Sequence, residues 1–276
     1  MTDKLFSLLQ RFELHARVFQ AGPACRSATY DDGDGLAYIH VLRSGSLRVE
    51  APAHPSLLID EPSLFLYMNP TTHSLYPLDP ETVLVCGSFD FGAGLRNPIA
   101  RALPDVVVVR LADAPILDAA LQLLFAEASH QESGRQAVLD RLIEVVIVQV
   151  LRDLIDQQRL QYGLLAGLAD PRLSKAIDAM HTEPARPWSL PSLAEVAGMS
   201  RARFAARFRD RVGTTPAAYL AEWRLSLAQA LLRKGKSVQL VADAVGYGSA
   251  SALSRAFRAH IGQSPVEWAR EQSAVL

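Results

Sequence analysis

Short apolar runs separated by turn sequences occupy the first part of the chain. The runs are rich in Val, Leu, Ile, Phe and Tyr and fall at residues 17–19, 36–42, 46–49, 56–59, 64–67, 82–91 and 106–111. Clusters of Gly, Pro and Asp lie between them, as at 31–35 and 51–55. Strands at such intervals predict an antiparallel barrel or sandwich, preceded by a short amphipathic helix over residues 5–15. We expect Arg43-Ser44-Gly45 to be the loop of a hairpin, with the glycine at positive φ.

Two stretches with helical periodicity follow, at about 115–129 and 135–158. In the second stretch, apolar residues recur on one side, at Leu139, Leu142, Ile143, Val146, Val150, Leu151 and Leu154. This stripe predicts either a helix face that covers the barrel or a surface at which two copies of the chain meet. A glycine-containing segment at 160–170 is expected to be a linker, and from residue 172 onward the pattern is helical.

A short sequence motif is repeated in this last part of the chain, at residues 193–219 and at 241–268. Gly198 corresponds to Gly246 at an offset of 48, and Ser200 to Ser249 at an offset of 49, because the second turn is one residue longer. Each copy predicts a short helix, a glycine turn and a second helix that begins after a serine. That order describes a helix-turn-helix, and two in tandem indicate a protein that reads DNA.

The second helix of each copy has an apolar side and a polar side. Residues at every fourth position are expected to be core, namely Phe204, Phe208, Val212, Leu253, Phe257 and Ile261. The opposite side and the serine before each helix form the expected DNA-binding surface: Ser200, Arg201, Ala202, Arg203, Ala205, Ala206, Arg207, Arg209, Ser249, Ala250, Ser251, Ser254, Arg255 and Arg258. Arg255 is best placed to bind a guanine edge, and several other arginines are expected at phosphates. For any single arginine, the alternative is a solvated surface residue.

Charge is distributed unevenly along the chain. Residues 1–167 carry 13 Lys and Arg against 20 Asp and Glu, whereas residues 168–276 carry 15 against 9. A basic second half agrees with DNA as its partner, although uneven solubilising charge is the simpler explanation. Two cysteines in 276 residues do not predict a disulfide scaffold, and a reducing cytoplasm fits best. The first ten residues are too short and polar for a signal peptide and no apolar run approaches 18 residues, so we expect no membrane partner.

A specific set of residues between about 172 and 270 carries a family resemblance. They are Ala194, Ala197–Ser200, Phe204, Arg207–Phe208, Gly213, Pro216, Tyr219, Trp223–Arg224 and Ala228, followed by Val241–Ala242, Val245–Tyr247, Ser249, Ser254–Phe257, Gly262, Ser264–Pro265 and Trp268. Together they resemble the tandem helix-turn-helix domain of AraC/XylS-type transcription regulators. The resemblance implies that the two recognition helices enter successive major grooves and that bases are contacted at Ala202, Ala205, Ala206, Ala250, Ser251, Ser254 and Arg255. Alanine at 206 departs from the polar or basic residue common in the family, so specificity is expected to depend more on the second copy.

Weaker matches are found in the first half, at His40–Gly45 and Asn69–His73, and around Cys25 and Val85–Phe89. They resemble the cupin-type sensor domain often found ahead of this DNA-binding domain, in a subgroup that includes oxidant-responsive regulators. The expected fold class is α+β, with a cupin-like antiparallel β-barrel plus helices followed by an all-α domain. We expect a sensor barrel at 1–112, a helical dimerisation or linker region at 113–167 and the DNA-binding domain at 168–276.

Three functions are open to the first domain. A cupin metal site needs about three converging ligands, but only His40 and His73 hold plausible positions, which argues against a metal or other cofactor. Cys25 and Cys86 are either a thiol switch or two buried core thiols. An apolar pocket for a small effector is the third function, with Tyr38, Phe65, Tyr67, Phe89 and Phe91 as lining unless they are plain core residues.

These patterns together predict a sequence-specific transcription regulator in the cytoplasm, whose barrel senses a small effector or an oxidant. The expected partners are double-stranded promoter DNA, a second copy of the chain, since symmetric pairs commonly read short sites, and RNA polymerase if the protein is an activator. The alternative is a cupin-type metal enzyme with an accessory DNA-binding tail. The missing third ligand argues against that alternative, and no Ser-His-Asp or paired-carboxylate pattern replaces it, so we expect no enzymatic activity.

Overall fold

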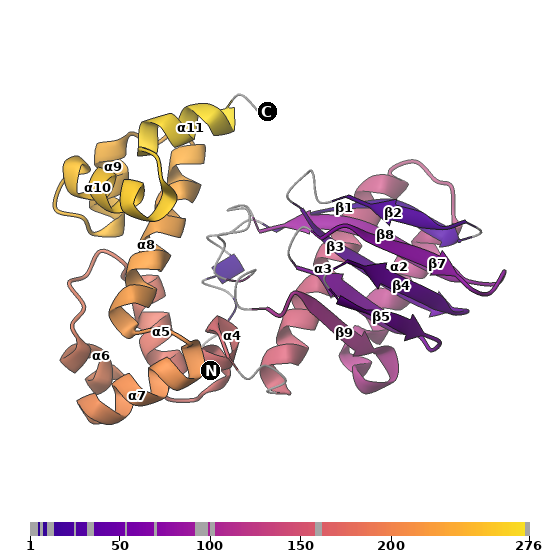
Figure 1. Ribbon diagram of the computed structural model, residues 1–276, viewed down its shortest axis with the longest axis horizontal. Coiled ribbons are helices and arrows are strands. Elements are labelled where there is room, and N and C mark those ends of the chain that lie inside the picture. The colour runs from indigo at the N-terminus through magenta and orange to yellow at the C-terminus, as the bar shows by residue number, and fades with distance from the viewer. Residues whose placement is uncertain are drawn as a thin grey trace. The chain divides into compact units, whose positions relative to one another are not determined.

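The chain folds into two units, one built on β-sheets and one helical (Figure 1). The computed structural model describes residues 5, 8–9, 14–24, 26–31, 36–52, 54–68, 71–91, 99, 103–157 and 162–273. The β unit comprises residues 14–95 and 103–157, and the helical unit comprises residues 1–13, 96–102 and 158–276. Most of the helix expected at 5–15 lies outside the described residues.

Two antiparallel sheets make up the strand part of the β unit. Its strands among the described residues are β1 (His15–Pro23), β2 (Ala28–Tyr30), β3 (Ala37–Ser44), β4 (Leu47–Ala51), β5 (His54–Ile59), β6 (Ser63–Tyr67), β7 (His73–Pro77), β8 (Val83–Asp90) and β9 (Val106–Arg110). The first sheet has the order β1-β8-β3-β6-β9, and the second has the order β2-β7-β4-β5. The predicted antiparallel β architecture is confirmed.

The central strand β3 explains why one apolar run is continuous. Tyr38 and Leu42 belong to a buried cluster that also includes residues of β4 and β7, so this side of β3 faces the second sheet. Ile39 and Val41 alternate with them and are also fully buried. Helices α2 (Asp118–Ser129) and α3 (Arg135–Asp156) pack on the neighbouring first-sheet strand β1 (Figure 1). Because both faces of β3 are buried, apolar residues do not alternate with polar ones along this strand, and its sequence is a continuous apolar run.

The expected hairpin at Arg43-Ser44-Gly45 is wrong. Gly45 does have a positive φ of 82°, but β3 pairs with β6 and β8, whereas β4 pairs with β5 and β7. The loop therefore carries the chain from one sheet to the other. A hairpin and a connection between two sheets can use the same turn residues, and they differ only in which strands pair with the strands before and after the turn.

The apolar stripe of α3 covers the sheet. Leu139, Ile143, Val146 and Val150 are fully buried within this single chain, against β1 and α2. Asp140 also holds β1, because its carboxylate accepts the backbone N–H of Val18 at 2.8 Å. Most of this stripe therefore covers the β unit, which is one of its two interpretations, and pairing with a second copy stays a prediction.

The helical unit is all-α in its described part. Its helices are α4 (Leu164–Ala169), α5 (Leu173–Thr182), α6 (Leu190–Val196), α7 (Arg201–Val212), α8 (Pro216–Arg233), α9 (Val238–Val245), α10 (Ala250–Ile261) and α11 (Pro265–Ser273). Residues 164–169, expected to be part of a linker, instead form α4, which is buried against α5 and α7. No helix of the described residues is long and apolar enough to cross a membrane.

Candidate DNA interface and the buried cluster of the β unit

Two helix-turn-helix units are built by the same turn. After α6, the N–H of Gly198 donates to Glu195 O and the N–H of Met199 donates to Ala194 O. After α9, the N–H groups of Gly246 and Tyr247 make the equivalent pair of bonds to Asp243 and Ala242. This pattern closes a helix with a residue in the left-handed region, and both glycines have the required positive φ, 62° and 82°. The predicted glycine turns are thus confirmed in detail.

The recognition helices α7 and α10 are anchored by their apolar faces. Phe204, Phe208, Leu253 and Phe257 are fully buried, whereas Ile261 is half-buried. In the first unit, the rings of Phe204 and Phe208 lie 5.6 Å apart, and α8 provides Tyr219 at 5.6 Å from Phe208. These contacts fix which side of each helix is left for a partner. Val196 of α6, although apolar, is exposed.

The two serines that precede the recognition helices behave differently. The hydroxyl of Ser249 accepts the N–H of Ala252 at 3.1 Å, which is a side-chain cap. Ser200 occupies the equivalent position before α7 with extended backbone, but its side chain makes no capping hydrogen bond. The exposed Ser200 hydroxyl is therefore available to a ligand.

Most of the predicted DNA-binding residues lie on the accessible side of the two helices. Ser200, Arg201, Ala202, Arg203, Ala206, Arg207, Arg209, Ser251, Arg255 and Arg258 are exposed, and Ala205, Ser249, Ala250 and Ser254 are half-buried. Arg258 also lies 3.7 Å from Glu267 of α11, in an exposed ion pair. The sequence periodicity therefore identified an accessible surface with basic side chains on both helices.

Arg207 is the exception, because the fold already uses its guanidinium. Its Nε donates to Oδ2 of Asp170 at 2.5 Å, and the Asp170 side chain is 1% exposed. The other oxygen of Asp170 accepts the N–H groups of Arg172 and Leu173, where α5 begins. Burial alone would raise the pKa of Asp170, but these hydrogen bonds and the positive charge of Arg207 outweigh it and lower the pKa. Arg207 therefore has a structural role, and the DNA contact expected from the sequence stays a prediction.

The loop between α5 and α6 joins the two helix-turn-helix units. Arg224 of α8 donates from Nε to Pro184 O at 2.7 Å and from Nη2 to Arg186 O at 2.9 Å. The backbone of Ala185, between them, lies so close to Gly246 that a β-carbon built on this glycine would be 2.6 Å from Ala185 Cα. The turn of the second unit therefore packs on a loop that precedes the first. Only the Trp-Arg pair of the family resemblance pointed to Arg224 in the sequence, and nothing there pointed to its partners.

Inside the β unit, the two histidines singled out by the sequence bind each other. His40 of β3 and His73 of β7 are both buried, with their Nε2 atoms 2.8 Å apart. His73 Nδ1 lies 2.7 Å from Thr71 O, so it must carry the proton that it donates to this carbonyl. His73 Nε2 is then the acceptor and His40 Nε2 the donor. The remaining nitrogen, His40 Nδ1, is buried and has no hydrogen-bond partner in the described part of the chain.

Aromatic rings surround this histidine pair and keep it neutral. Tyr67 stacks on His73 with the ring centroids 4.1 Å apart, and Phe65 stacks on His40 at 4.9 Å. Burial lowers the pKa of His40 well below its ordinary value, and the neighbouring His73 lowers it further. Burial likewise lowers the pKa of His73. Among the described residues, no group of three or more His, Cys, Asp or Glu side chains is arranged to hold a metal ion.

Cys86 lies beside the same cluster, on β8. It pairs with His40 across the sheet and is completely buried. Burial raises the pKa of its thiol to about 12, and a hydrogen bond with Tyr30 only partly offsets this effect. Cys25 lies outside the described residues, so the geometry of the second thiol of the expected switch is not described. Its sequence neighbour Ala24 belongs to the same buried cluster as Cys86.

The fold and the accessible surface define a class of protein. Two helix-turn-helix units share the long helix α8, each presents a recognition helix with exposed arginines, and a separate double-sheet unit precedes them. This combination is that of a tandem helix-turn-helix DNA-binding protein with an N-terminal β domain.

Comparison with known proteins agrees with this class. Residues 3–156 match the cupin family, and residues 193–271 match a helix-turn-helix domain family. The chain is 31% identical to a putative AraC-like transcription regulator from Streptomyces lividans over 97% of each chain. It is 30% identical to the RCS-specific HTH-type transcriptional activator RclR of Escherichia coli strain K12, over 83% of this chain and 82% of the relative.

A DNA-binding domain is among the solved structures that resemble part of this chain. The DNA-binding domain of AdpA, a global transcriptional factor, in complex with a target DNA, is 32% identical over 38% of this chain and 95% of that chain, with a TM-score of 0.36. The chain belongs to the AraC family of transcription regulators, with an N-terminal cupin domain and a C-terminal helix-turn-helix domain. It is a DNA-binding regulator, and these relatives are regulators and not enzymes. The predicted family is confirmed.

Proposed function

We propose that the protein is a sequence-specific regulator that uses α7 and α10 in two successive major grooves and the cupin domain to sense a signal. The observation that carries the proposal is the pair of recognition helices, each with a buried phenylalanine face and an exposed face that bears arginines. Major-groove reading needs such a helix with side chains that reach base edges.

We propose a division of labour between the two helices. The exposed Arg255 and Ser251 and the half-buried Ser254 give α10 polar groups for base edges. The accessible side of α7 has Ala202, Ala205 and Ala206 flanked by arginines, which suits thymine methyl groups and phosphates. On this proposal, α10 contributes most of the specificity and α7 contributes most of the backbone affinity.

Selection of bound duplexes from a random pool tests this function. The full chain should enrich a site with two conserved segments about 10 base pairs apart, with the stronger base preferences in one segment. Footprinting of the enriched site and of a shuffled control should show protection of the former only. If the bound pool keeps a random composition, the protein is a general polyanion binder and the proposal is wrong.

For the signal, we propose that Cys25 and Cys86 form a thiol switch, in the reducing cytoplasm expected from the sequence. Two thiols would lose two protons and two electrons to an oxidant and form one disulfide. The resemblance of the first half to a cupin subgroup that includes oxidant-responsive regulators supports an oxidant signal, and Ala24, the residue before Cys25, lies in the buried cluster of Cys86. Cys25→Ser should abolish an oxidant response measured by DNA binding and leave reduced binding unchanged, whereas an intact response would exclude the switch. A small organic effector is the alternative signal, and the burial and raised pKa of Cys86 favour the other reading of the cysteines as two core thiols.

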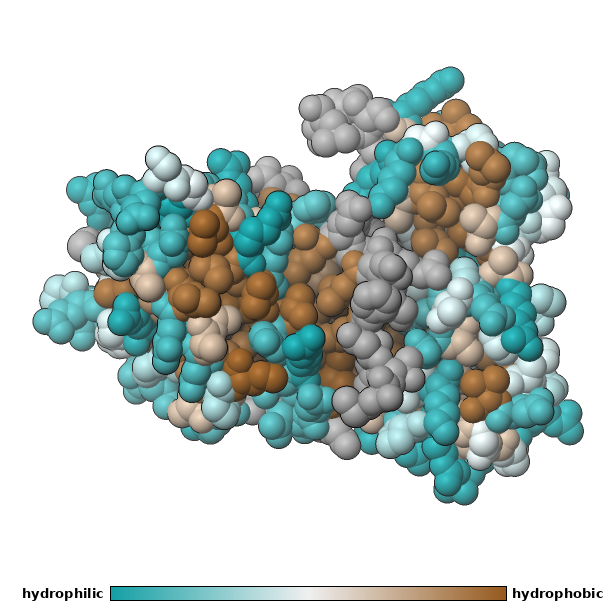
Figure 2. All heavy atoms as spheres, turned by 180° about the vertical axis from the view of Figure 1, so that it is seen from behind, coloured by the Kyte–Doolittle hydropathy of each residue, from teal (hydrophilic) through white to brown (hydrophobic). Residues whose placement is uncertain are grey.

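We also propose that the chain pairs with a second copy through the outer face of α3. This face carries Val138 and Val145, which are 43% and 45% exposed, and the half-buried Leu142 and Val148. Figure 2 shows apolar side chains at the surface of the β unit, which is on the left in that view. Val138→Glu with Val145→Glu should convert a dimer into a monomer in light scattering, whereas Arg17→Glu, at an exposed position of β1, should not. RNA polymerase is a further partner if the protein activates transcription.

A further inference from the structure

A surface cavity lies beside the C-terminal end of α2, outside the barrel interior. Two adjoining parts meet at Arg43, Phe125 and Ser129, with volumes of about 380 and 530 Å³. The larger part is also lined by Ala21, Gly22, Pro23, Val83, Ala128, Gln131 and Arg135, and the smaller part by Leu111, Asp118, Leu121, Gln122, Ala126 and His130. This size suits a small organic molecule.

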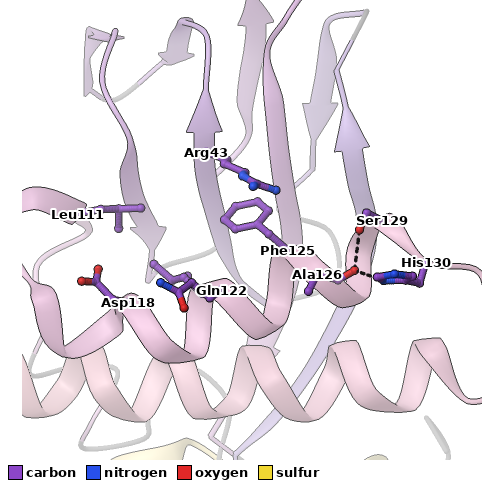
Figure 3. A pocket seen from close by; sticks show the side chains of 9 residues that line it. Arg43, Leu111, Asp118, Gln122, Phe125, Ala126, Ser129 and His130 are labelled. Carbon is purple, nitrogen blue, oxygen red and sulfur yellow. Dashed lines mark hydrogen bonds between the residues drawn. The ribbon is translucent and has the colours of Figure 1, made fainter.

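Arg43 projects into this cavity from the end of β3. Figure 3 shows its guanidinium over the ring of Phe125, 5.3 Å from the centroid, with Ser129 and His130 further along the helix. Its guanidinium makes no hydrogen bond or ion pair with the described part of the chain. Stacking on Phe125 orients the group but leaves its N–H donors to solvent or to a ligand.

A second guanidinium lines the same space. Arg135 is the first residue of α3, and its Nη2 donates to Ala128 O at 2.9 Å. Its Nε is buried without a hydrogen-bond partner. Among the described residues that line the larger part of the cavity there are two arginines and no acidic side chain, because Asp118 lines only the smaller part.

We propose that this cavity binds a small organic anion. A carboxylate or a phosphate would accept hydrogen bonds from the guanidinium groups of Arg43 and Arg135, and its negative charge would relieve the repulsion between these two positive charges. The apolar body of the ligand would lie against Phe125, Pro23 and Val83. The binding site is independent of the proposed DNA reading, because it lies within the β unit and involves neither recognition helix.

Isothermal titration calorimetry on the full chain tests the site with three probes of similar shape. The probes are 3-phenylpropionate, phenyl phosphate and the uncharged 3-phenylpropan-1-ol. At least one of the two anions should bind at one site per chain and at least about tenfold more tightly than the alcohol, since a charge-assisted hydrogen bond exceeds a neutral one. The anion that binds identifies the preferred head group. Equal binding of all three probes, or binding of none of them at concentrations up to about 10 mM, would overturn the proposal.

Matched variants locate the binding to this cavity. Arg43→Gln and Arg135→Gln should each weaken the preferred anion by about tenfold or more, because each removes a charged donor. Arg17→Gln removes an exposed arginine of β1 that lines neither part of the cavity, and it should leave binding unchanged. Thermal unfolding of each variant without ligand shows whether the variant still folds. Phe125→Leu keeps an apolar side chain in the cavity but removes the ring on which Arg43 stacks, so it tests whether this stacking is needed to orient Arg43. A loss for Arg17→Gln equal to that for Arg43→Gln would contradict the site.

Discussion

Asp170 combines two stabilising roles in a single buried carboxylate. One oxygen caps the first turn of α5, and the other binds the guanidinium of Arg207 on α7. A buried carboxylate is tolerated only when its charge is compensated, and here backbone donors and an arginine share that task. The pair therefore ties the first recognition helix to the start of the domain.

Asp170→Asn and Arg207→Ala should each destabilise the helical unit by about 1–3 kcal/mol, with less than additive loss in the double variant. The lowered pKa of Asp170 means that its stabilising charge is present at neutral pH and is lost as the pH falls below about 4. The difference between the natural chain and Asp170→Asn in urea unfolding should thus shrink from pH 7 to pH 3. A constant difference would show that the carboxylate charge contributes nothing.

Arg255 and Arg258 offer a test of base reading on one helix, because both are exposed on α10. Arg255→Ala should lose about 1–3 kcal/mol of discrimination at one base step of the selected site. Arg258→Ala, next to Glu267, should weaken binding to all sequences alike. Competition titrations with single-base variants of the site measure both effects. Uniform weakening by Arg255→Ala would reassign this residue to a phosphate.

Some site residues could be predicted from the sequence and others could not. The exposed faces of α7 and α10 follow from positions of Phe204, Phe208, Leu253 and Phe257, because helical periodicity is a local property. The binding of Arg207 to Asp170 joins residues 37 positions apart, and no periodicity carries that information. His40 and His73 were identified by their motif positions, but their mutual hydrogen bond depends on how the two sheets close.

At the scale of elements, the two glycine turns look alike but have different surroundings. A β-carbon at Gly198 would meet no atom within 4 Å, whereas at Gly246 it would collide with the backbone of Ala185. Both positions have positive φ, so any side chain is strained at either. Gly248, in the second turn, has neither a close neighbour nor a positive φ.

Alanine at these three glycines should therefore give three different results. Gly248→Ala should be close to neutral, Gly198→Ala should cost about 1–2 kcal/mol, and Gly246→Ala should cost more than Gly198→Ala because backbone must also move. Urea unfolding followed by tryptophan fluorescence measures this, since all three tryptophans, Trp188, Trp223 and Trp268, lie in the helical unit. Equal losses at Gly198 and Gly246 would contradict the contact with Ala185.

Elements with strong local signals were predictable, and short or doubly covered ones were not. The helices α2, α3, α7 and α10 match their expected ranges to within a few residues. Strand β2 has only three residues, and β7 is His-Ser-Leu-Tyr-Pro, which carries little strand signal. The loop at Gly45 shows the limit most clearly, because its sequence specifies a turn but not which sheet receives the next strand.

At the scale of the molecule, charge separates the two halves of the chain. The half from residue 168 carries an excess of positive residues and contains both recognition helices, and the acidic half contains the sheets. Repulsion between the acidic half and DNA phosphates leaves the basic half as the favoured contact.

DNA affinity should accordingly fall steeply with salt. Each phosphate neutralised by an arginine contributes about 0.9 to the slope of log affinity against log salt concentration. Arg201→Ala and Arg209→Ala should each reduce this slope by about one, and Arg17→Ala in the β unit should not change it. Fluorescence anisotropy titrations between low and physiological salt give the slopes. Unchanged slopes for the α7 variants would remove these arginines from the phosphate contacts.

The loop at residues 184–186 has a consequence for the evolution of binding sites. Arg224 donates hydrogen bonds to this loop, and Gly246 packs against its backbone. These contacts fix the distance between the two recognition helices. One inserted base pair would rotate half of the operator by about a tenth of a turn relative to the other half. Operators of this protein should therefore diverge between promoters by base substitution, while the number of base pairs between their two conserved segments stays constant.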